Sequence, residues 1–595
     1  MHRTWILTIL ALQTACLVNQ PEKPPNRPSR RVVLVSFDGL AAERHQRLGK
    51  ERRYRDPEGL AAFYATGFAA EAAPPNPTLT AVAHATIATG RLPQSHGIVA
   101  NRFHLPESPA GATVSGFDQP WEAPSLWEVL GSRGKKVGVI TFPGCDGTSP
   151  RRSADFFMMY TNQPHAPARF TVLEPREHGE ESWHFSLEVE LQLSDSWEKL
   201  TFPIRARAPR EPGGNWELQV GSGHRGGQQV SLGDWFSLTV TVPHRDGGQQ
   251  TVGAWCLVKE IRGFPPKLVL YQGAFYSLDA KPRAFRELVE REAGFWPGPP
   301  DDRALAEGLK GRMGLSLSEY GQQLERFASF FTAATRAAIE HMDFDLLLAY
   351  QPVVDEAQHA LTVADPRQPI YTEGLSATAS EFLDWTYLLA DKAVGQLARA
   401  LDFSRDTLVV VSDHGIQPVW LQANLQTWLL KEGLCPGQPG QPLSPQCQLW
   451  AVQGGGVAHL YLNLEDSEPT GISTQARTSR LLLRASEGLS RLEAAGKGLV
   501  EAMAPKEKLQ VWGLAHPHSG DLVVFAKPGI VFGGRLGGPL YGPPPYAGAH
   551  GFLNHHPSMA AVFFARGAGV PARVTGKKKL TEVAPFVLSL LGAQK

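Results

Sequence analysis

The stretch VVLVSFDGL, residues 32–40, places an uninterrupted apolar and β-branched run directly before an aspartate. Two later stretches repeat this arrangement: FDLLLAY (344–350) and TLVVVS (407–412). Runs of this length and composition indicate strands that are buried on both faces of a parallel sheet. Long helical patterns lie between them, for instance over residues 318–342 and 380–403. We therefore expect an α/β sandwich with a mostly parallel central sheet flanked by helices.

One block of the chain follows a different period. In FSLEVELQL (185–193) and FSLTVTV (236–242), apolar and polar residues alternate, and glycine-rich turns separate such runs. A period of two predicts half-buried antiparallel strands. We expect an inserted β domain at residues 161–285, serving as a lid or shape element, between two parts of a core at residues 31–160 and 286–595.

Length and charge narrow the classes of function. A chain of 595 residues is too long for one hydrophobic core. The 58 Lys and Arg residues balance the 58 Asp and Glu residues, so no overall charge favours binding to a nucleic-acid duplex. Affinity for phosphate must come from a local site.

The first 30 residues have the layout of a secretory signal followed by a linker. A basic start and a short apolar run precede small residues and Cys16, and the proline-rich PEKPPNRPSR (21–30) follows. The signal resembles that of a bacterial lipoprotein, in which the cysteine carries the lipid. We expect an exported protein, periplasmic or anchored to the membrane through Cys16; the alternative is a plain cleaved signal.

Four further cysteines, Cys145, Cys256, Cys435 and Cys447, permit two disulfides in an exported chain. Cys435 and Cys447 bracket the loop PGQPGQPLSPQ, and we predict a bridge between them. The cysteine spacing does not suggest a metal site.

An aspartate follows each of the three buried runs: Asp38, Asp355 and Asp413. The carboxyl ends of strands in open α/β sheets meet at one edge, so we expect these carboxylates to converge. Three carboxylates gathered in one place repel one another, and a cation must hold them together.

Histidines accompany these aspartates. His359 lies four residues after Asp355, His414 directly follows Asp413, and His550 stands in GAHGFLNHHP. A mixed shell of aspartate and histidine suits divalent zinc best among the common ions. Six such ligands exceed what one tetrahedral ion takes, so the pattern predicts two ions, which together can clamp a phosphoryl group during transfer.

Several motifs, in this order, resemble those of the type I phosphodiesterase and nucleotide pyrophosphatase branch of the alkaline phosphatase superfamily. They include VVLVSFDGL, NPTLTAVAHATIATGRLPQSHGIVANRF, YQPVVDEAQHALT, VVVSDHGI, HPHSGDLVVFAKPG and GAHGFLNHHPSMAAVFFARG. The resemblance covers most of residues 31–150 and 318–595 and omits the β insert. It implies an alkaline-phosphatase-like sandwich and a hydrolase of small phosphate esters.

The resemblance also implies roles for single residues. Asp38, Asp413 and His414 match the ligands of one zinc, and Asp355, His359 and His550 match those of the other. Thr80 matches the nucleophile that bridges the metals and forms a phosphothreonine, and Asn101 matches the asparagine that donates to a phosphoryl oxygen. From the residues alone, Thr80 or Thr78 also fits the role of a helix N-cap. His84, His96, His555 and His556 are better explained as structural residues than as ligands.

One departure leaves the substrate open. Ala81 stands where nucleotide-cleaving members of the family carry an aromatic residue that stacks on the base, a contact worth roughly 1–3 kcal/mol. We rank a phosphodiesterase first and a phosphomonoesterase or phosphonate hydrolase second. An exported protein that binds zinc and phosphate esters without turnover is the alternative from another class.

Overall fold

The computed structural model describes residues 30–179, 182–193, 196–209, 215–221, 227–436, 443–444, 446–463, 475–494, 496–535, 537–571, 573–574 and 576–594. The predicted export signal, with Cys16 and nearly all of the linker, lies outside these residues. Two compact units divide the chain, and we call them the core unit and the β-rich unit. The core unit comprises residues 28–157 and 338–595, and residues 158–337 form the β-rich unit.

The core unit is built on the three runs that the sequence singled out. They form β1 (Val32–Phe37), β18 (Leu346–Gln351) and β19 (Thr407–Val411), and all their residues are buried. β1 lies between the other two and pairs parallel with both, Val32 facing Leu346 on one side and Thr407 on the other. The predicted α/β class with a mostly parallel sheet is confirmed.

Further strands extend this sheet on both sides. β5 (Val137–Ile140) pairs parallel with β18, whereas β31 (Ala561–Gly567) runs antiparallel to β19. β2 (Phe68–Ala73) pairs with β31 and also with the short β32 (Arg573–Val574) and β33 (Lys578–Lys579). The helices of this unit are α1 (Ala42–Lys50), α2 (Ala62–Thr66), α3 (Thr80–Thr89), α4 (Pro93–His96), α5 (Leu126–Gly131), α9 (Val353–Leu361), α10 (Glu373–Arg399), α11 (Leu425–Lys431), α12 (Gln475–Ser490) and α13 (Val583–Leu590).

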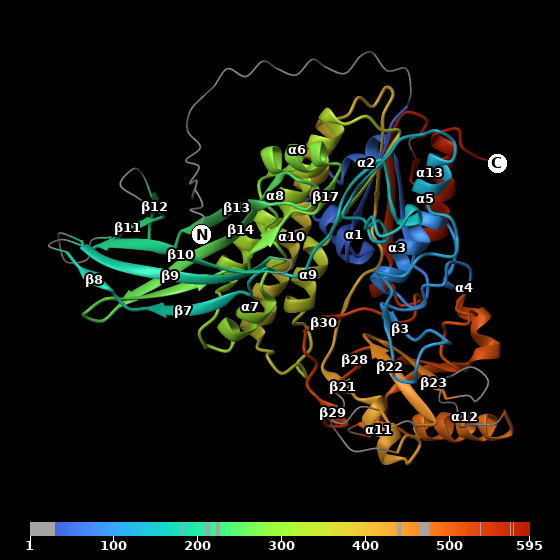
Figure 1. The fold of residues 1–595 in the computed structure, drawn as a ribbon. Helices are drawn as coiled ribbons and strands as arrows, with labels where there is room; N and C mark the ends of the chain where they lie inside the picture. Colours follow the sequence, from blue (N-terminus) through green and yellow to red (C-terminus); the bar gives the residue numbers. More distant parts are fainter. Residues whose placement is uncertain are drawn as a thin grey trace. The chain divides into compact units, whose positions relative to one another are not determined.

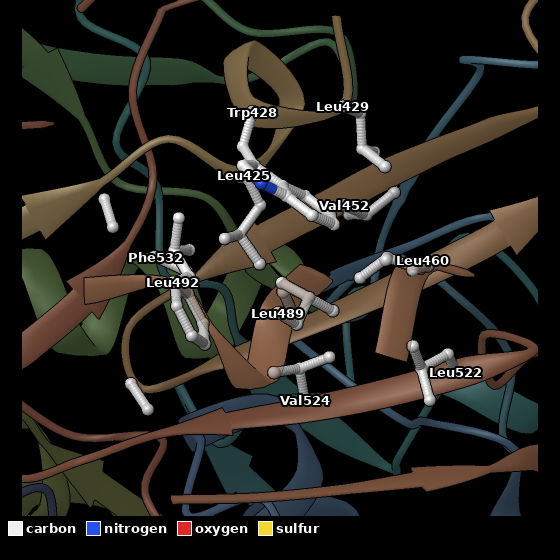
Figure 2. Close-up of a cluster of buried hydrophobic side chains, with 14 of the residues drawn as sticks. Leu425, Trp428, Leu429, Val452, Leu460, Leu489, Leu492, Leu522, Val524 and Phe532 are labelled. Carbon is white, nitrogen blue, oxygen red and sulfur yellow. The ribbon is translucent and has the colours of Figure 1, made fainter. Parts of the chain in front are cut away.

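A second sheet in the core unit has its own hydrophobic core. Its strands, in spatial order, are β22 (Leu449–Gly454), β23 (Val457–Leu462), β27 (Leu522–Ala526) and β26 (Val500–Pro505). Figure 1 shows β22 and β23 beside α11 and α12. Figure 2 shows the buried side chains between them, among which Trp428, Leu460 and Leu489 are each less than 5% exposed. The predicted disulfide between Cys435 and Cys447 is present in this core, whereas Cys145 and Cys256 are free and buried.

Short pairings complete the core unit. They are β3 (Arg102–Phe103) with β4 (Val114–Ser115), β20 (Gln417–Pro418) with β30 (Gly548–Ala549), β21 (Leu421–Ala423) with β28 (Ile530–Phe532) and β29 (Tyr541–Gly542), and β24 (Glu493–Ala494) with β25 (Lys497–Gly498). Four 3-10 turns are η1 (Pro150–Arg152), η2 (Lys506–Trp512), η3 (Pro557–Met559) and η4 (Leu580–Glu582).

The β-rich unit contains the alternating runs that the sequence predicts as strands. In β9 (Ser182–Leu193), Phe185, Leu187, Val189 and Leu191 are buried. β9 pairs antiparallel with β10 (Ser196–Arg207), and Figure 1 shows the two as long neighbouring arrows. The other strands of the described residues here are β7 (Arg169–Leu173), β8 (Glu177–His178), β11 (Glu217–Val220), β12 (Gln228–Val230), β13 (Trp235–Pro243), β14 (Gln249–Arg262), β15 (Lys267–Gln272), β16 (Tyr276–Ser277) and β17 (Ala280–Lys281).

This unit extends beyond the predicted insert of residues 161–285. It also contains α6 (Arg283–Ala293), α7 (Asp302–Leu309) and most of α8 (Leu317–His341). The contacts explain why: Tyr271 of β15 donates a hydrogen bond to Asp301, and Lys259 of β14 forms an ion pair with Glu319. The helical periodicity of α8 predicts the helix itself but not the strands on which it packs.

Candidate metal centre and active site

The three aspartates converge at the carboxyl edge of the central sheet, as expected from their places after the strands. Asp38 follows β1, Asp413 follows β19, and Asp355 lies in the first turn of α9, just after β18. Gly39 makes the approach of Asp355 possible: its φ is 68°, and a Cβ there would lie 2.9 Å from Asp355 Oδ1.

Two groups of three potential ligands share one histidine. Asp38, Asp413 and His414 form one, and Asp355, His414 and His550 form the other; within each group the ligand atoms lie within 4.8 Å of one another. His414 Nε2 is 3.0 Å from Asp413 Oδ2 and 3.6 Å from Asp38 Oδ1. The predicted ligand His359 is beside the second group, with its Nε2 3.2 Å from Asp355 Oδ2.

The carboxylates carry unused acceptors that fit a cation. Asp38 Oδ1, Asp355 Oδ1 and Asp413 Oδ2 are buried and have no hydrogen-bond partner among the described residues. A buried carboxylate oxygen without a partner is costly unless a cation or a proton satisfies it. Burial, together with the charges of Asp413 and Asp355, raises the pKa of Asp38 well above its usual range. The three side chains therefore fit a site for positive charge.

The histidines are oriented to present the nitrogen that a metal needs. Nδ1 of His359 donates to the carbonyl of Gly548 at 2.8 Å, and Nδ1 of His550 donates to the carbonyl of Thr78 at 3.0 Å. Because a carbonyl only accepts, Nδ1 must carry the hydrogen, and in the neutral ring the lone pair lies on Nε2. His414 makes the same bond, to Gly415 at 3.2 Å. Such hydrogen bonds fix the orientation of metal-binding imidazoles.

Charge coupling within the second group is strong. Burial tends to raise the pKa of Asp355, but the neighbouring His359 outweighs it and lowers this pKa to about 2. Burial lowers and Asp355 raises the pKa of His359, and the carboxylate prevails, giving about 9. In the absence of a cation, the aspartate thus keeps its charge by holding a proton on the histidine.

Thr80 is the first residue of α3 and faces this centre. Its Oγ1 lies 3.2 Å from His414 Nε2. The cap position is Leu79, which makes no side-chain cap bond, so neither Thr80 nor Thr78 is the N-cap that local sequence suggested. Thr78 instead donates to the carbonyl of Phe552 at 3.0 Å and accepts from the backbone of Gly551. The hydroxyl of Thr80 is therefore not used to cap the helix.

Asn101 lies next to the start of the same helix. Its Oδ1 accepts a hydrogen bond from the backbone N–H of Ala81 at 3.0 Å. The side-chain amide nitrogen of Asn101 therefore points away from Ala81 and can donate a hydrogen bond. It borders a cavity of about 440 Å³ with further lining from Leu79, Ala100, Arg102, Ser115, His359, Val452, Gln453, Val457, His459, Tyr546 and His550. The structure thus brings Asn101 and two predicted ligands to one cavity.

Ala81, which stands where an aromatic residue is expected, lies in a buried position beside Gly116. Ala81 is 3% exposed, and a Cβ placed on Gly116 would lie 3.3 Å from the Ala81 side chain. A larger side chain at position 81 would therefore have to displace its neighbours. The aromatic side chain of this cavity comes from another segment: the ring of Tyr546 lies 5.3 Å from that of His359.

Sequence reasoning missed several residues around the centre. The hydroxyl of Tyr350 donates to Asp38 Oδ2 at 2.6 Å, and Gln358 donates to the carbonyl of Gly39 at 2.7 Å. His84, which the sequence predicts to be structural, donates through Nδ1 to the carbonyl of Thr80 at 2.9 Å, while its Nε2 accepts from Ser36. Tyr350 and Gln358 lie within motifs already quoted, but no spacing rule shows that their side chains turn toward Asp38 and Gly39.

Comparison with known proteins identifies the family of this chain. The model of the type I phosphodiesterase / nucleotide pyrophosphatase family matches residues 32–263 and 272–553. Bis(5'-adenosyl)-triphosphatase enpp4 of Xenopus laevis is 27% identical over 164 residues, which are 27% of this chain and 34% of that protein. Family member 7 of the ectonucleotide pyrophosphatases/phosphodiesterases of Mus musculus is 30% identical over 151 residues, 24% of this chain and 32% of that protein. The chain thus aligns with about a third of each of these two relatives.

Two solved structures align with most of the chain at low identity. Murine ectonucleotide pyrophosphatase/phosphodiesterase 5, an inactive variant in complex with AMP, has 14% identity, a TM-score of 0.48 and 95% coverage of both chains. The human protein of the same name has 14% identity, a TM-score of 0.46 and the same coverage. The family model, by contrast, spans most of the chain and includes all the residues of the centre. The chain belongs to the type I phosphodiesterase / nucleotide pyrophosphatase family.

Proposed function

We propose that this chain is a metal-dependent hydrolase of phosphoric esters, with phosphodiesters as the preferred class. The observation that carries the proposal is the hydroxyl of Thr80, which is free of a capping role and lies beside a buried cluster of unsatisfied carboxylate oxygens. Family membership supports the same reaction class.

Two divalent ions fit the donor set, and zinc suits its mixture of imidazole and carboxylate ligands. The residues that would hold them are Asp38, Asp413 and His414 for one ion and Asp355, His359 and His550 for the other. When bound, such ions neutralise phosphate oxygens and make a nearby hydroxyl easier to deprotonate.

Thr80 is the proposed nucleophile. Its Oγ1 gives up a proton and attacks phosphorus, the bond to the leaving oxygen breaks, and the departing alcohol takes up a proton. Water then cleaves the phosphothreonine and restores the hydroxyl. Asn101, whose Oδ1 is occupied by Ala81, directs its amide nitrogen as a donor to a phosphoryl oxygen. The position at the start of α3 adds the favourable end of the helix dipole.

The test uses bis(p-nitrophenyl) phosphate and purified protein with measured metal content. Thr80→Ala removes the nucleophile and is expected to lower the rate by more than about a thousandfold. Thr80→Ser keeps the hydroxyl and is expected to retain a measurable part of the activity, and both variants should bind the same amount of metal. Activity of Thr80→Ala within tenfold of wild type would contradict the nucleophile. A wild type that binds metal but cleaves no ester would favour the non-catalytic binding protein.

A phosphomonoesterase is the second candidate, and Arg102 is the observation that favours it. A monoester dianion gains more from an extra cation than a diester does. Of the arginines near the site motifs, Arg151 pairs with Glu128 and Arg152 with Asp146, whereas Arg102 lines the cavity. The apolar lining from Leu79, Val452, Val457 and Tyr546 suits the second group of a diester. A monoester rate a hundredfold above the diester rate, lost in Arg102→Ala, would reverse the ranking.

Export is a separate proposal. The disulfide between Cys435 and Cys447 supports it, because structural disulfides form in oxidising compartments. In the described part of the chain, no helix is both long and apolar enough to span a membrane. We propose that the N-terminal signal directs export and that Cys16 is lipidated in a bacterial host. Cell fractionation of wild type and Cys16→Ser tests this: the variant should move from the membrane fraction to the soluble periplasm.

A further inference from the structure

A cluster of side chains that could bind a metal lies outside the candidate centre, on Glu501, His555 and His556. The Nε2 atoms of both histidines point at the one carboxylate: His555 lies 3.2 Å from Glu501 Oε1, and His556 lies 2.8 Å from Glu501 Oε2. The three ligand atoms lie within 4.8 Å of one another. The family's motif contributes His550 to the candidate centre but gives no role to this histidine pair.

These distances are compatible with one bound ion. Ligand atoms at bonds of about 2.0–2.2 Å around a tetrahedral ion lie roughly 3.3 Å apart. One nitrogen to oxygen distance, 3.2 Å, is close to this value, and the other, 2.8 Å, is about 0.5 Å shorter. The two imidazole rings are tilted by 35°, with their centroids 4.3 Å apart, so they are not stacked face to face. Two neutral imidazoles and one carboxylate carry a net charge of −1, which suits a divalent cation.

The surrounding backbone holds the ligands in place. Glu501 lies at an irregularity of β26, where the pairing with β27 shifts between Val500 and Ala502. The histidine segment is fixed by Asn554, whose backbone donates to Asn76 at 2.8 Å and whose side chain donates to the carbonyl of Pro74 at 2.7 Å. A site held by neighbouring hydrogen bonds needs little rearrangement to bind an ion.

Exposure leaves room for the remaining ligands. The side chain of His555 is 62% exposed, whereas Glu501 and His556 are 19% and 18% exposed. Water can therefore complete the coordination on the outer side, while Glu501 and His556 form the inner side. Hydrogen bonds from the two histidines to the carboxylate give the same distances when no ion is bound. Titration with zinc distinguishes a hydrogen-bonded cluster from a metal site.

We propose that Glu501, His555 and His556 bind a further divalent transition-metal ion, zinc in the first place. The ion would link β26 of the second sheet to the segment between His550 and β31 of the central sheet. It would thereby stabilise the segment that follows a ligand of the candidate centre, as ions that bind only the folded state do. The proposal does not depend on the hydrolase activity.

The test measures zinc binding to holoprotein whose high-affinity sites are already filled. Zinc chloride is titrated calorimetrically, and the unfolding temperature is recorded with and without it. We expect one further ion to bind and the unfolding temperature to rise. Glu501→Gln keeps acceptor and donor atoms for hydrogen bonding but loses the charge, so it should fold normally and bind the further ion more than about tenfold more weakly. His555→Ala should weaken binding in the same direction.

Two controls keep the outcome interpretable. His341→Ala removes a partly exposed histidine that faces a single carboxylate, Glu340, at 4.0 Å, and it should leave binding unchanged. Thr80→Ala should also bind the further ion as wild type does, so loss of hydrolysis and loss of this site remain distinguishable. The proposal is overturned if wild type takes up no further zinc, or if Glu501→Gln and His555→Ala bind it with wild-type affinity.

Discussion

The core unit contains the candidate centre and the cluster of Glu122, His516 and His518, which both combine histidines with carboxylates. The two differ in how their side chains are hydrogen-bonded. At the candidate centre, three buried aspartate oxygens are without a partner among the described residues. In the cluster of Glu122, His516 and His518, the ligand atoms lie equally close together, yet protein groups already satisfy them. His516 Nδ1 accepts the N–H of His518 at 3.1 Å, so its Nε2 carries the hydrogen and donates to Glu122 at 3.0 Å.

The comparison indicates that a metal site is better identified by ligand atoms without a hydrogen-bond partner than by the closeness of the ligand atoms alone. A metal at the Glu122 cluster would require both nitrogens of His516 to act as acceptors, which a neutral imidazole does not allow. At the candidate centre, each histidine instead donates through Nδ1 to a carbonyl, so Nε2 of the neutral ring is available to a cation. The cluster around Glu501 lies between these cases, because no backbone contact fixes the tautomers of its histidines among the described residues.

The largest effect is expected from changing a carboxylate of the centre. Asp355→Asn removes the negative charge that faces His359. It also replaces one oxygen of a carboxylate whose Oδ1 is buried and has no hydrogen-bond partner among the described residues. We expect the bound metal to fall and ester hydrolysis to drop by more than about a thousandfold. Metal analysis and rates on bis(p-nitrophenyl) phosphate check both. Full metal content together with full activity would show that unsatisfied oxygens do not identify ligands here.

A buried histidine whose nitrogens are both paired should behave as a neutral structural group, and His45 tests this. Its ring contacts the hydroxyls of Tyr54 at 2.8 Å and Tyr64 at 3.2 Å. Burial lowers the pKa of His45 from 6.5 to about 4. Between these values the unfolded chain binds the proton and the folded chain does not, so stability falls as the pH drops from 6.5 toward 4. The expected loss is about 3 kcal/mol.

Unfolding of wild type and His45→Phe across this pH range provides the measurement. The variant leaves the tyrosine hydroxyls unpaired and should be less stable at neutral pH, but its stability should depend less steeply on pH. An unchanged slope would mean that His45 does not titrate as its burial implies.

A substitution of His84 tests whether this residue supports Thr80 or binds the metal. It lies one turn after Thr80, donates to the carbonyl of that residue and accepts from Ser36, and its Nδ1 is 3.6 Å from Asp413 Oδ2. His84→Gln should displace Thr80 slightly and lower kcat by roughly 10- to 100-fold. KM and metal content should stay near wild type, and steady-state kinetics with metal analysis measure all three. Loss of metal would instead assign His84 to the ligand set.

The smallest effect is expected at the satisfied cluster. Glu122→Gln replaces a half-exposed carboxylate that accepts from His516 with an amide that also accepts. Metal content and activity should be unchanged, and the free energy of unfolding should change by no more than about 0.5 kcal/mol. Loss of a bound ion in this variant would show that the Glu122 cluster also binds metal, contrary to the prediction.

Local sequence determined the strands and their alternation with helices. VVLVSF and TLVVVS become buried parallel neighbours because largely apolar, β-branched runs are stable only when both faces are covered. The alternation in 185–193 likewise predicts β9 and its buried face. The bridge between Cys435 and Cys447 agrees with the prediction made from their places at the two ends of one short loop.

The partition of roles at the site is decided by tertiary structure. The order of residues cannot show that Thr78 bonds to Phe552 while Thr80 faces His414, because those partners are more than 300 residues away. Nor can it show that Ala81 is buried beside Gly116 while Tyr546 lines the cavity. Sequence alone names the groups capable of binding metal. Which nitrogens are free, and which oxygens lack a partner, depends on hydrogen bonds that form only when distant segments pack together.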